Sequence, residues 1–158
     1  MRISEIITES TIKKGLEARS KIAAIEELVD LLVEAHEVSM AARATIIESI
    51  VAREKLVSTG MEHGVAIPHG AVDSVDDVVA ALAVSNAGID FQSIDGKPTY
   101  IVVLLVLPAN KYSSSVQTMA GISRLLTHKR LRDRVRNAQS ADDIMDIIIE
   151  EEEHQILS

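Results

Sequence analysis

Two apolar runs near the middle of the chain restrict its fold more than any other feature. They cover residues 78–85 and 99–107, and neither alternates between apolar and polar positions. Continuous runs of Val, Ile, Leu and Ala at this length are typical of strands that are buried on both faces of a sheet. The turn signal Asp95-Gly96, followed by Pro98, separates the two runs. The sequence therefore predicts two central strands in a layered α/β domain.

Helical periodicity indicates what covers these strands. Ser20 is an N-cap candidate, and apolar residues follow it at spacings of three and four: Ile22, Ile25, Leu28, Val29, Leu32 and Ala35. Ser39 is a second N-cap candidate, for a helix that ends near Glu54 and has its core face at Ala44, Ile47, Ile50 and Val51. Both patterns predict amphipathic helices that pack on the sheet.

The two ends of the chain complete the expected order of elements. Residues 3–15 predict a helical turn and then a short strand near residues 11–16. After a loop at residues 71–77, the second half predicts a strand that ends at Pro108 and a polar loop at residues 109–114. A helix is predicted next, with one face formed by Val116, Met119, Ile122, Ser123 and Leu126. A short helix follows within residues 127–137. The last helix is capped at Ser140, and its acidic run at residues 150–153 is expected to fray. About five helices and two or three buried strands make one α/β domain.

Composition excludes several classes of partner. The 158 residues carry a formal net charge of −8 and include one Phe, two Tyr and no Trp. The negative charge disfavours nucleic-acid phosphates and anionic membranes, and base stacking has almost no aromatic side chains to use. The longest apolar run, residues 100–107, is far shorter than the ~20 residues of a spanning helix, and the N-terminus lacks a signal-peptide core. With no cysteine, we expect a cytoplasmic protein that binds no nucleic acid and does not insert into a membrane.

The stretch from residue 53 to residue 70 holds the candidate active site. Three glycines and Pro68 break it into turns around residues 65–67, which predict a brief strand. Pro68 fixes its own φ and keeps the preceding residue extended, so His69 is presented from a stiff backbone. In a neutral imidazole one ring nitrogen holds a lone pair, while a hydrogen bond at the other fixes the tautomer. His69 is therefore a candidate nucleophile.

The residues around His69 resemble a known signature. Arg53-Glu54, Ser58-Thr59-Gly60 and Gly64-Val65-Ala66-Ile67-Pro68-His69-Gly70 are similar to the phosphorylation site of fructose/mannitol-type EIIA domains of the sugar phosphotransferase system, including nitrogen-regulatory EIIA proteins. Further matches are Gly88-Ile89-Asp90-Phe91, Asp95-Gly96-Lys97-Pro98, the apolar run that ends at Pro108, and the helix with Ser123, Leu125 and Leu126. The likeness extends over the whole chain. It implies a single domain, residues 1–158, with a central mixed β-sheet flanked by helices.

The resemblance also implies a function. His69 would accept a phosphoryl group from a phosphohistidine carrier protein and pass it to an EIIB partner, with Arg53 beside the phosphate and without a cofactor. Ser58, Thr59 and Ser115 are candidates for further hydrogen bonds to that group. Phosphoryl transfer depends mainly on positioning and on charge stabilisation, and a guanidinium can donate two parallel hydrogen bonds to the phosphoryl oxygens.

Ser115 departs from the family pattern. EIIA domains of this type commonly carry a second histidine seven residues after the proline that corresponds to Pro108, and this chain has Ser115 there. A hydroxyl can donate a hydrogen bond, but it cannot share a titratable proton near neutral pH. The alternative is therefore a nitrogen-regulatory-type protein whose phosphorylation state switches binding to regulatory targets, with onward transfer weak or lost.

Three other polar features have simpler interpretations. His63 could pair with His69 at a metal, but no thiolate or acidic residue stands at ligand spacing, so we expect no metal site. Glu54 would repel a phosphate, which favours a structural bond to an arginine or to the loop. The basic cluster within residues 129–136 could bind an acidic partner or nucleic acid, but a solvated helix face balanced against the acidic tail is favoured.

Overall fold

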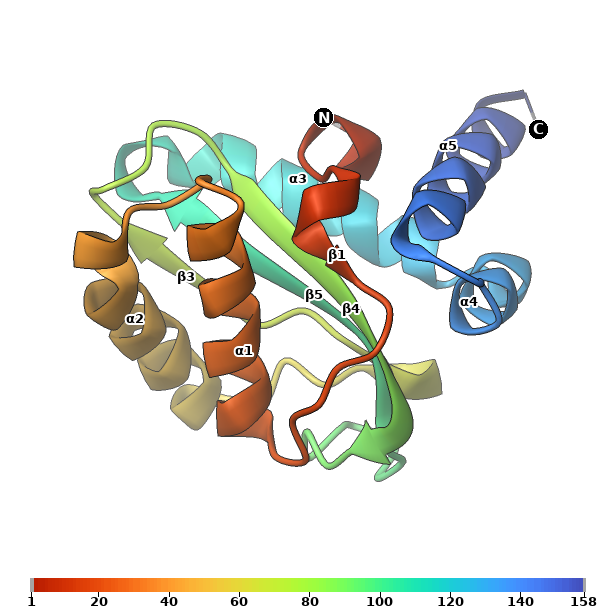
Figure 1. The fold of residues 1–158 in the computed structure, drawn as a ribbon, viewed down its shortest axis with the longest axis horizontal. Coiled ribbons are helices and arrows are strands. Elements are labelled where there is room, and N and C mark those ends of the chain that lie inside the picture. Colours follow the sequence, from red (N-terminus) through yellow and green to blue (C-terminus); the bar gives the residue numbers. More distant parts are fainter. Residues whose placement is uncertain (1, 158) are drawn as a thin grey trace.

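The two predicted central strands pair with each other in the middle of a five-stranded sheet. In the computed structural model, which describes residues 2–157, β4 (Val79–Ile89) runs antiparallel to β5 (Thr99–Pro108) (Figure 1). On one side β1 (Ile12–Lys13) pairs parallel with β4, and on the other β2 (Val65–Ala66) and β3 (His69–Val72) pair parallel with β5. The sheet is therefore mixed, which confirms the α/β fold with a central mixed sheet.

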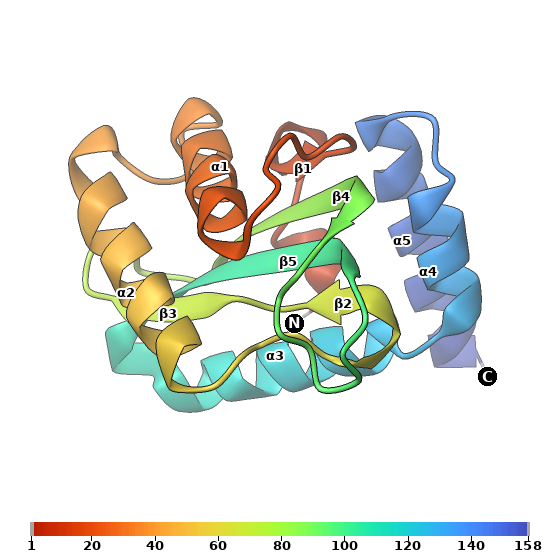
Figure 2. The same cartoon turned by 90° about the horizontal axis from the view of Figure 1, so that it is seen from below.

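Helices cover both faces of this sheet. They are α1 (Lys21–Glu34), α2 (Arg43–Leu56), α3 (Tyr112–Leu126), α4 (Lys129–Arg136) and α5 (Ala141–Leu157). Figure 2 shows α1 and α2 on one side of the sheet and α3 on the other. Helices α4 and α5 lie at the right-hand end of this view, and their buried residues share a core with those of α3. The layers match the expectation that both faces of the central strands are buried.

The alternation of side chains along β5 divides the interior into two cores. Its two sets of residues are Ile101, Val103, Leu105 and Leu107 on the α3 side, and Val102, Leu104 and Val106 on the α1–α2 side. All seven are at most 1% exposed. Burial of one such side chain contributes roughly 1.5–3 kcal/mol. Because β5 supplies both cores, it is the strand on which the packing of the domain depends.

Serine hydroxyls cap three helical segments as predicted. The side-chain oxygens of Ser20, Ser39 and Ser140 each accept a hydrogen bond from the backbone N–H three residues later, at 3.2, 3.2 and 3.1 Å. Such a cap satisfies one of the N–H groups that a helix start leaves without an intrahelical acceptor. Ser39 caps a 3₁₀ turn, Met40–Ala42, that continues into α2.

Three residues that the helical patterns predicted to face the core do not do so. Ile22, Ala44 and Val116 are exposed, because each lies at the border of its helix stripe or beyond it. On α2 the buried positions are spaced by four and comprise Ile46, Ile50 and, unexpectedly, Glu54. A carboxylate thus occupies a core position.

Three predicted irregular segments are more ordered than expected. The loop placed at residues 71–77 begins only after Val72, since β3 continues to that residue by pairing with β5. Within residues 109–114 a 3₁₀ turn leads directly into α3. The acidic run at residues 150–153 does not fray, because α5 continues to Leu157 with the carboxylate of Glu151 buried against two arginines.

Within residues 2–157, no helix combines the length and the apolar character that crossing a membrane requires.

Candidate functional site

His69 opens β3 at the edge of the sheet. It lies opposite Leu105 of β5, and the N–H of Leu105 donates to the carbonyl of Pro68 at 3.0 Å. Partners in register on neighbouring strands point to the same face, so the imidazole is on the face that α3 covers. Among the described strands β3 pairs only with β5, and the His69 side chain is half-buried. The brief strand predicted at residues 65–67 is confirmed as β2, but a second strand begins at the histidine itself.

The tautomer of His69 follows from one hydrogen bond. Its Nδ1 lies 2.9 Å from the carbonyl oxygen of Ile67. A carbonyl oxygen can only accept, so in the neutral ring Nδ1 carries the proton and Nε2 keeps its lone pair. The available nucleophilic atom is therefore Nε2.

Helix α2 runs antiparallel to β3. Near its middle, the hydroxyl of Ser49 donates to the carbonyl of Ala71 at 2.9 Å. Near its end, Glu54 binds Thr59, whose carbonyl accepts from the N–H of Ile67 at 3.3 Å. Later residues of the helix thus lie beside earlier residues of the strand.

This direction places Arg53 level with His69. Arg53 follows Ser49 by four residues, about 6 Å along a helix, and His69 precedes Ala71 by two residues, about 6.6 Å along a strand. Because α2 covers the opposite face of the sheet, the guanidinium has to pass round the open edge of β3 to reach the imidazole. Its Nη1 donates to the carbonyl of Val57 at 2.8 Å, a bond that also stabilises the end of α2.

Gly70 allows α2 to approach β3 closely. A Cβ atom at this position would lie 2.7 Å from the Ser49 hydroxyl and 2.8 Å from the backbone nitrogen of Ile50. Both distances are shorter than van der Waals contact, so any larger residue would push the helix and strand apart. The glycine after His69 serves the approach of the helix.

The three candidate hydroxyls of the site already donate within the protein. Ser58 Oγ donates to the carbonyl of Phe91, Thr59 Oγ1 donates to Glu54 Oε2 at 2.6 Å, and Ser115 Oγ donates to the carbonyl of Lys111 at 2.9 Å. Ser115 is fully buried in the first turn of α3. Each hydroxyl would have to release its acceptor before it donated to a phosphoryl group.

Glu54 is the centre of a buried polar cluster, of which the sequence predicted only a structural bond. Its side chain is 2% exposed and pairs with Lys21 Nζ at 3.1 Å. It also accepts from the backbone N–H and the hydroxyl of Thr59. The spacing of Glu54 from Ile46 and Ile50 was the available signal for its burial, whereas Lys21 had no local signal at all.

His63 does not belong to a group of side chains that could bind a metal ion. It has a left-handed backbone with φ of 67°, its N–H donates to Asp95 Oδ2 at 3.1 Å, and its imidazole is exposed beside Glu62. In the described part of the chain, no group of three or more His, Asp or Glu side chains could hold a metal ion.

The basic cluster is largely neutralised by neighbouring acids. Arg134 bonds Glu150 Oε2 at 2.7 Å and Glu151 Oε1 at 2.9 Å, and Arg130 bonds Glu151 at 3.0 Å. The guanidinium of Arg136 stacks 3.8 Å from the centre of the Tyr100 ring. These contacts agree with a helix face balanced by acids, but Arg132 is not solvated, because its side chain is buried and its Nη1 donates to the carbonyl of Leu126 at 2.9 Å.

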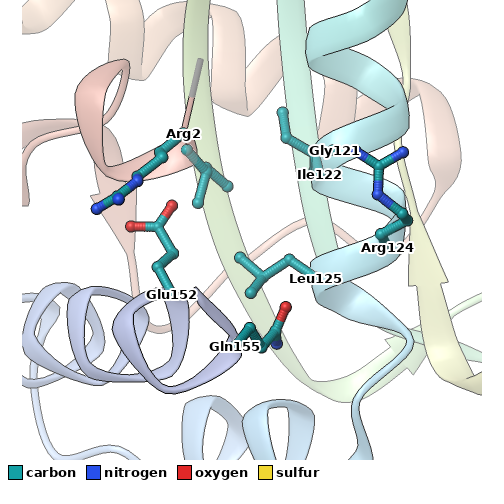
Figure 3. A pocket seen from close by; sticks show the side chains of 8 residues that line it. Arg2, Gly121, Ile122, Arg124, Leu125, Glu152 and Gln155 are labelled. Carbon is teal, nitrogen blue, oxygen red and sulfur yellow. The ribbon is translucent and has the colours of Figure 1, made fainter. Parts of the chain in front are cut away.

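A separate cleft of about 290 Å³ lies between the N-terminal turn, α3 and α5 (Figure 3). Its lining includes Arg2 and Arg124, and Glu152 reaches into it from α5. The carboxylate Oε2 of Glu152 accepts from the N–H of Ser4 at 3.3 Å and so ties α5 to the N-terminal turn. None of the residues predicted for phosphoryl transfer lines this cleft.

Comparison with known proteins identifies relatives over most of the chain. The family described as phosphoenolpyruvate-dependent sugar phosphotransferase system, EIIA 2, matches residues 5–151. The fructose-specific EIIABC component of the phosphotransferase system from Bacillus subtilis (strain 168) is 33% identical over 148 residues. The match covers 94% of this chain but 23% of that longer protein.

Two solved structures share the fold. The crystal structure of the nitrogen regulatory protein IIA-Ntr from Neisseria meningitidis superposes with a TM-score of 0.83 at 31% identity, and covers 92% of this chain and 98% of that one. The complex of enzyme IIA-mannitol with phosphorylated enzyme IIB-mannitol from Escherichia coli gives a TM-score of 0.74 at 19% identity, and covers 90% and 96%.

Proposed function

The chain belongs to the phosphoenolpyruvate-dependent sugar phosphotransferase system EIIA 2 family, and from this premise we propose that His69 is its phosphoryl acceptor. The donor is a phosphohistidine carrier protein, and the recipient is an EIIB protein or domain. The observation that carries the proposal is the bond from His69 Nδ1 to the carbonyl of Ile67. It leaves Nε2 with a lone pair on a half-buried ring, and the solved mannitol complex joins a protein of the same fold to a phosphorylated IIB enzyme.

The transfer needs no proton movement at the attacking atom. The lone pair of His69 Nε2 forms a bond to phosphorus as the bond between phosphorus and the donor imidazole nitrogen breaks. The bonding electron pair leaves with the donor nitrogen, and Nδ1–H stays bonded to the Ile67 carbonyl. That hydrogen bond offsets part of the positive charge that develops on the His69 ring during attack.

Arg53 is the proposed partner of the transferred oxygens. Its guanidinium has five N–H donors, and Nη1 is the group that donates to Val57. Donors on the rest of the fork can bond the equatorial oxygens when the side chain turns round the edge of β3. An arginine suits this role because its planar fork matches the geometry of a phosphoryl group.

Exposed apolar residues provide a surface for transient docking. Leu56 and Val57, at the end of α2 beside Arg53, are 79% and 67% exposed. Large apolar side chains in contact with water favour association, while a small patch permits rapid separation. We propose that donor and recipient use this patch in turn.

Phosphoryl labelling tests the assignment of His69. Incubation with a phosphohistidine donor is expected to give one acid-labile phosphoryl group, located on His69 by mass spectrometry at alkaline pH. His69→Ala should abolish the label, and the matched variant His63→Ala should retain it. Equal labelling of His69→Ala would show that another residue is the acceptor.

A regulatory role is the second candidate function. The similarity to a nitrogen regulatory protein covers nearly all of that chain, and Ser115 supplies no second imidazole. In this role the phosphoryl group on His69 adds negative charge at the docking patch and so changes which targets bind. Pull-downs with phosphorylated protein should then recover partners that differ from those recovered with unphosphorylated protein and with His69→Ala, which cannot carry the phosphoryl group. Identical partner sets in all three would exclude the switch.

A further inference from the structure

A continuous series of polar contacts joins α1 to the imidazole of His69. Lys21 Nζ lies 3.1 Å from Glu54 Oε1, which also accepts from the N–H of Thr59 at 3.0 Å. Glu54 Oε2 accepts from the Thr59 hydroxyl at 2.6 Å. The carbonyl of Thr59 accepts from the N–H of Ile67 at 3.3 Å, and the carbonyl of Ile67 accepts from His69 Nδ1 at 2.9 Å.

We propose that Lys21, Glu54 and Thr59 are positioning residues that hold His69 as the Nδ1–H tautomer with Nε2 directed to the donor. They act through the backbone of Ile67 and touch neither the phosphoryl group nor the attacking atom. The inference rests on the proposed function of His69, but it makes a separate statement about the resting imidazole.

Burial fixes the Glu54 end of the series. The carboxylate is 2% exposed and the Lys21 side chain 13% exposed, so each charge depends on the other and on the Thr59 donors. A buried carboxylate that loses a hydrogen-bond donor strongly destabilises the folded state. Because Thr59 supplies two of the donors to Glu54, a shift of Thr59 would be costly. The backbone of Thr59 is thereby anchored to α1 and α2.

Pro68 transmits this constraint to the imidazole. It stands between Ile67 and His69, its φ is fixed by the ring, and it favours an extended conformation of Ile67. A shift of the Ile67 carbonyl cannot be absorbed by rotation about the N–Cα bond of Pro68. A displaced carbonyl would leave Nδ1 without its acceptor, and the tautomer with the proton on Nε2 would then gain population and block attack.

The resting tautomer gives the first measurement. Nitrogen-15 chemical shifts of the neutral His69 ring are expected to show the Nδ1–H form in the wild type. Glu54→Gln and Lys21→Met should shift the ring towards a mixture with the Nε2–H form. The exposed positions Glu48 and Lys14 provide the matched controls Glu48→Gln and Lys14→Met, which should leave the shifts unchanged.

Kinetics of phosphorylation give the second measurement. We expect kcat for His69 labelling to fall about tenfold in Glu54→Gln, because a small misplacement of a reacting group costs one to two orders of magnitude. KM for the donor should stay unchanged, since the docking patch is intact. Thr59→Ser keeps both donors to Glu54 and should retain the rate, whereas Thr59→Val lacks the hydroxyl and should not.

The outcomes separate this inference from the proposed function. Wild-type ring shifts and kcat in folded Glu54→Gln and Lys21→Met would overturn the positioning role. If Glu54→Gln fails to fold, the nitrogen-15 shifts of the His69 ring in Thr59→Ser and Thr59→Val, measured without a phosphoryl donor, decide the question. Absence of label on wild-type His69 would overturn the proposed function alone, because the tautomer measurement needs no phosphoryl donor.

Discussion

The polar cluster around Glu54 and the ion pairs between α4 and α5 use similar chemical groups at different depths. Glu54 and its lysine are both nearly buried, at 2% and 13% exposure of their side chains. Glu151 is also buried, but its partners Arg130 and Arg134 are 64% and 33% exposed. The first cluster connects to the backbone beside His69, whereas the second joins two helices far along the chain from it. We therefore expect the first cluster to affect the geometry of His69 and the second to affect mainly the stability of the fold.

The largest expected effect separates two arginines, one from each region. Arg53→Met should lower the rate of His69 phosphorylation about 100-fold, because loss of one donor to a developing anion typically costs 10²–10³ in rate. Arg134→Met should leave that rate unchanged, since its guanidinium is committed to Glu150 and Glu151. Initial rates of label incorporation measure both variants. A similar rate in Arg53→Met and wild type would remove Arg53 from the site.

Substitution of Ser115 tests whether the first turn of α3 tolerates a larger side chain. Ser115 is fully buried with its hydroxyl on the carbonyl of Lys111, so Ser115→His should reduce the free energy of unfolding by about 1–3 kcal/mol through overpacking. Urea denaturation measures the loss. If transfer to an EIIB partner nevertheless becomes faster, the absent second histidine limits the natural protein. The exposed neighbour Ser114→His is the control for stability.

A stability effect without a kinetic effect should mark the α4–α5 region. Glu151→Gln removes the charge that Arg130 and Arg134 share, and we expect a loss of about 1–2 kcal/mol, below the 3–5 of a fully buried pair because the arginines reach solvent. Urea unfolding should show the loss, and the rate of His69 labelling should not change. Glu153→Gln, at an exposed position two residues further along α5, should change neither quantity. A slower labelling rate in Glu151→Gln would contradict the division of roles.

The smallest effect concerns the ion pair of Lys13 and Glu27, at 2.8 Å between β1 and α1. Burial alone would raise the pKa of Glu27, but bonds from Lys13 and from two backbone N–H groups outweigh it, so the pKa lies below the ordinary 4.5. A lowered pKa stabilises the fold above pH 4.5, and this stabilisation is lost as pH falls through the folded value.

Glu27→Gln should therefore be less stable than wild type by less than about 1 kcal/mol at pH 7. The difference should close under acid conditions, well below pH 4.5. Urea unfolding at pH 7 and pH 3 measures it. A difference that persists unchanged at pH 3 would assign the stabilisation to packing of the side chain.

The elements that could be predicted from the sequence are those with a local cause. The two apolar runs predicted β4 and β5, since burial on both faces leaves a composition signal. Ser20, Ser39 and Ser140 predicted three helical starts, because a cap acts on an N–H only a few residues away. The turns around Pro68 singled out His69 as a candidate nucleophile, and Arg53 came from a resemblance. Their placement at one level of the sheet agrees with a shared site, and their roles are proposals.

The features that could not be predicted depend on partners distant in sequence. The extension of β3 beyond His69 follows from pairing with Leu105 and its neighbours in β5. The order of the acidic run depends on arginines from α4. The burial of Glu54 requires Lys21 from α1, and no spacing within either helix specifies that contact. Each depends on tertiary structure that local propensity does not encode.

Strand β5 is flanked by β4 on one side and by β2 and β3 on the other. Its amide hydrogens should therefore exchange with deuterium only when the whole domain opens, whereas those of the one-sided β3 can exchange through local fraying. Docking partners would thus contact an edge strand, β3, that opens locally, next to a central strand, β5, whose amide hydrogens exchange slowly. His69 could then gain and lose a phosphoryl group repeatedly without opening β5, the strand that supplies both cores.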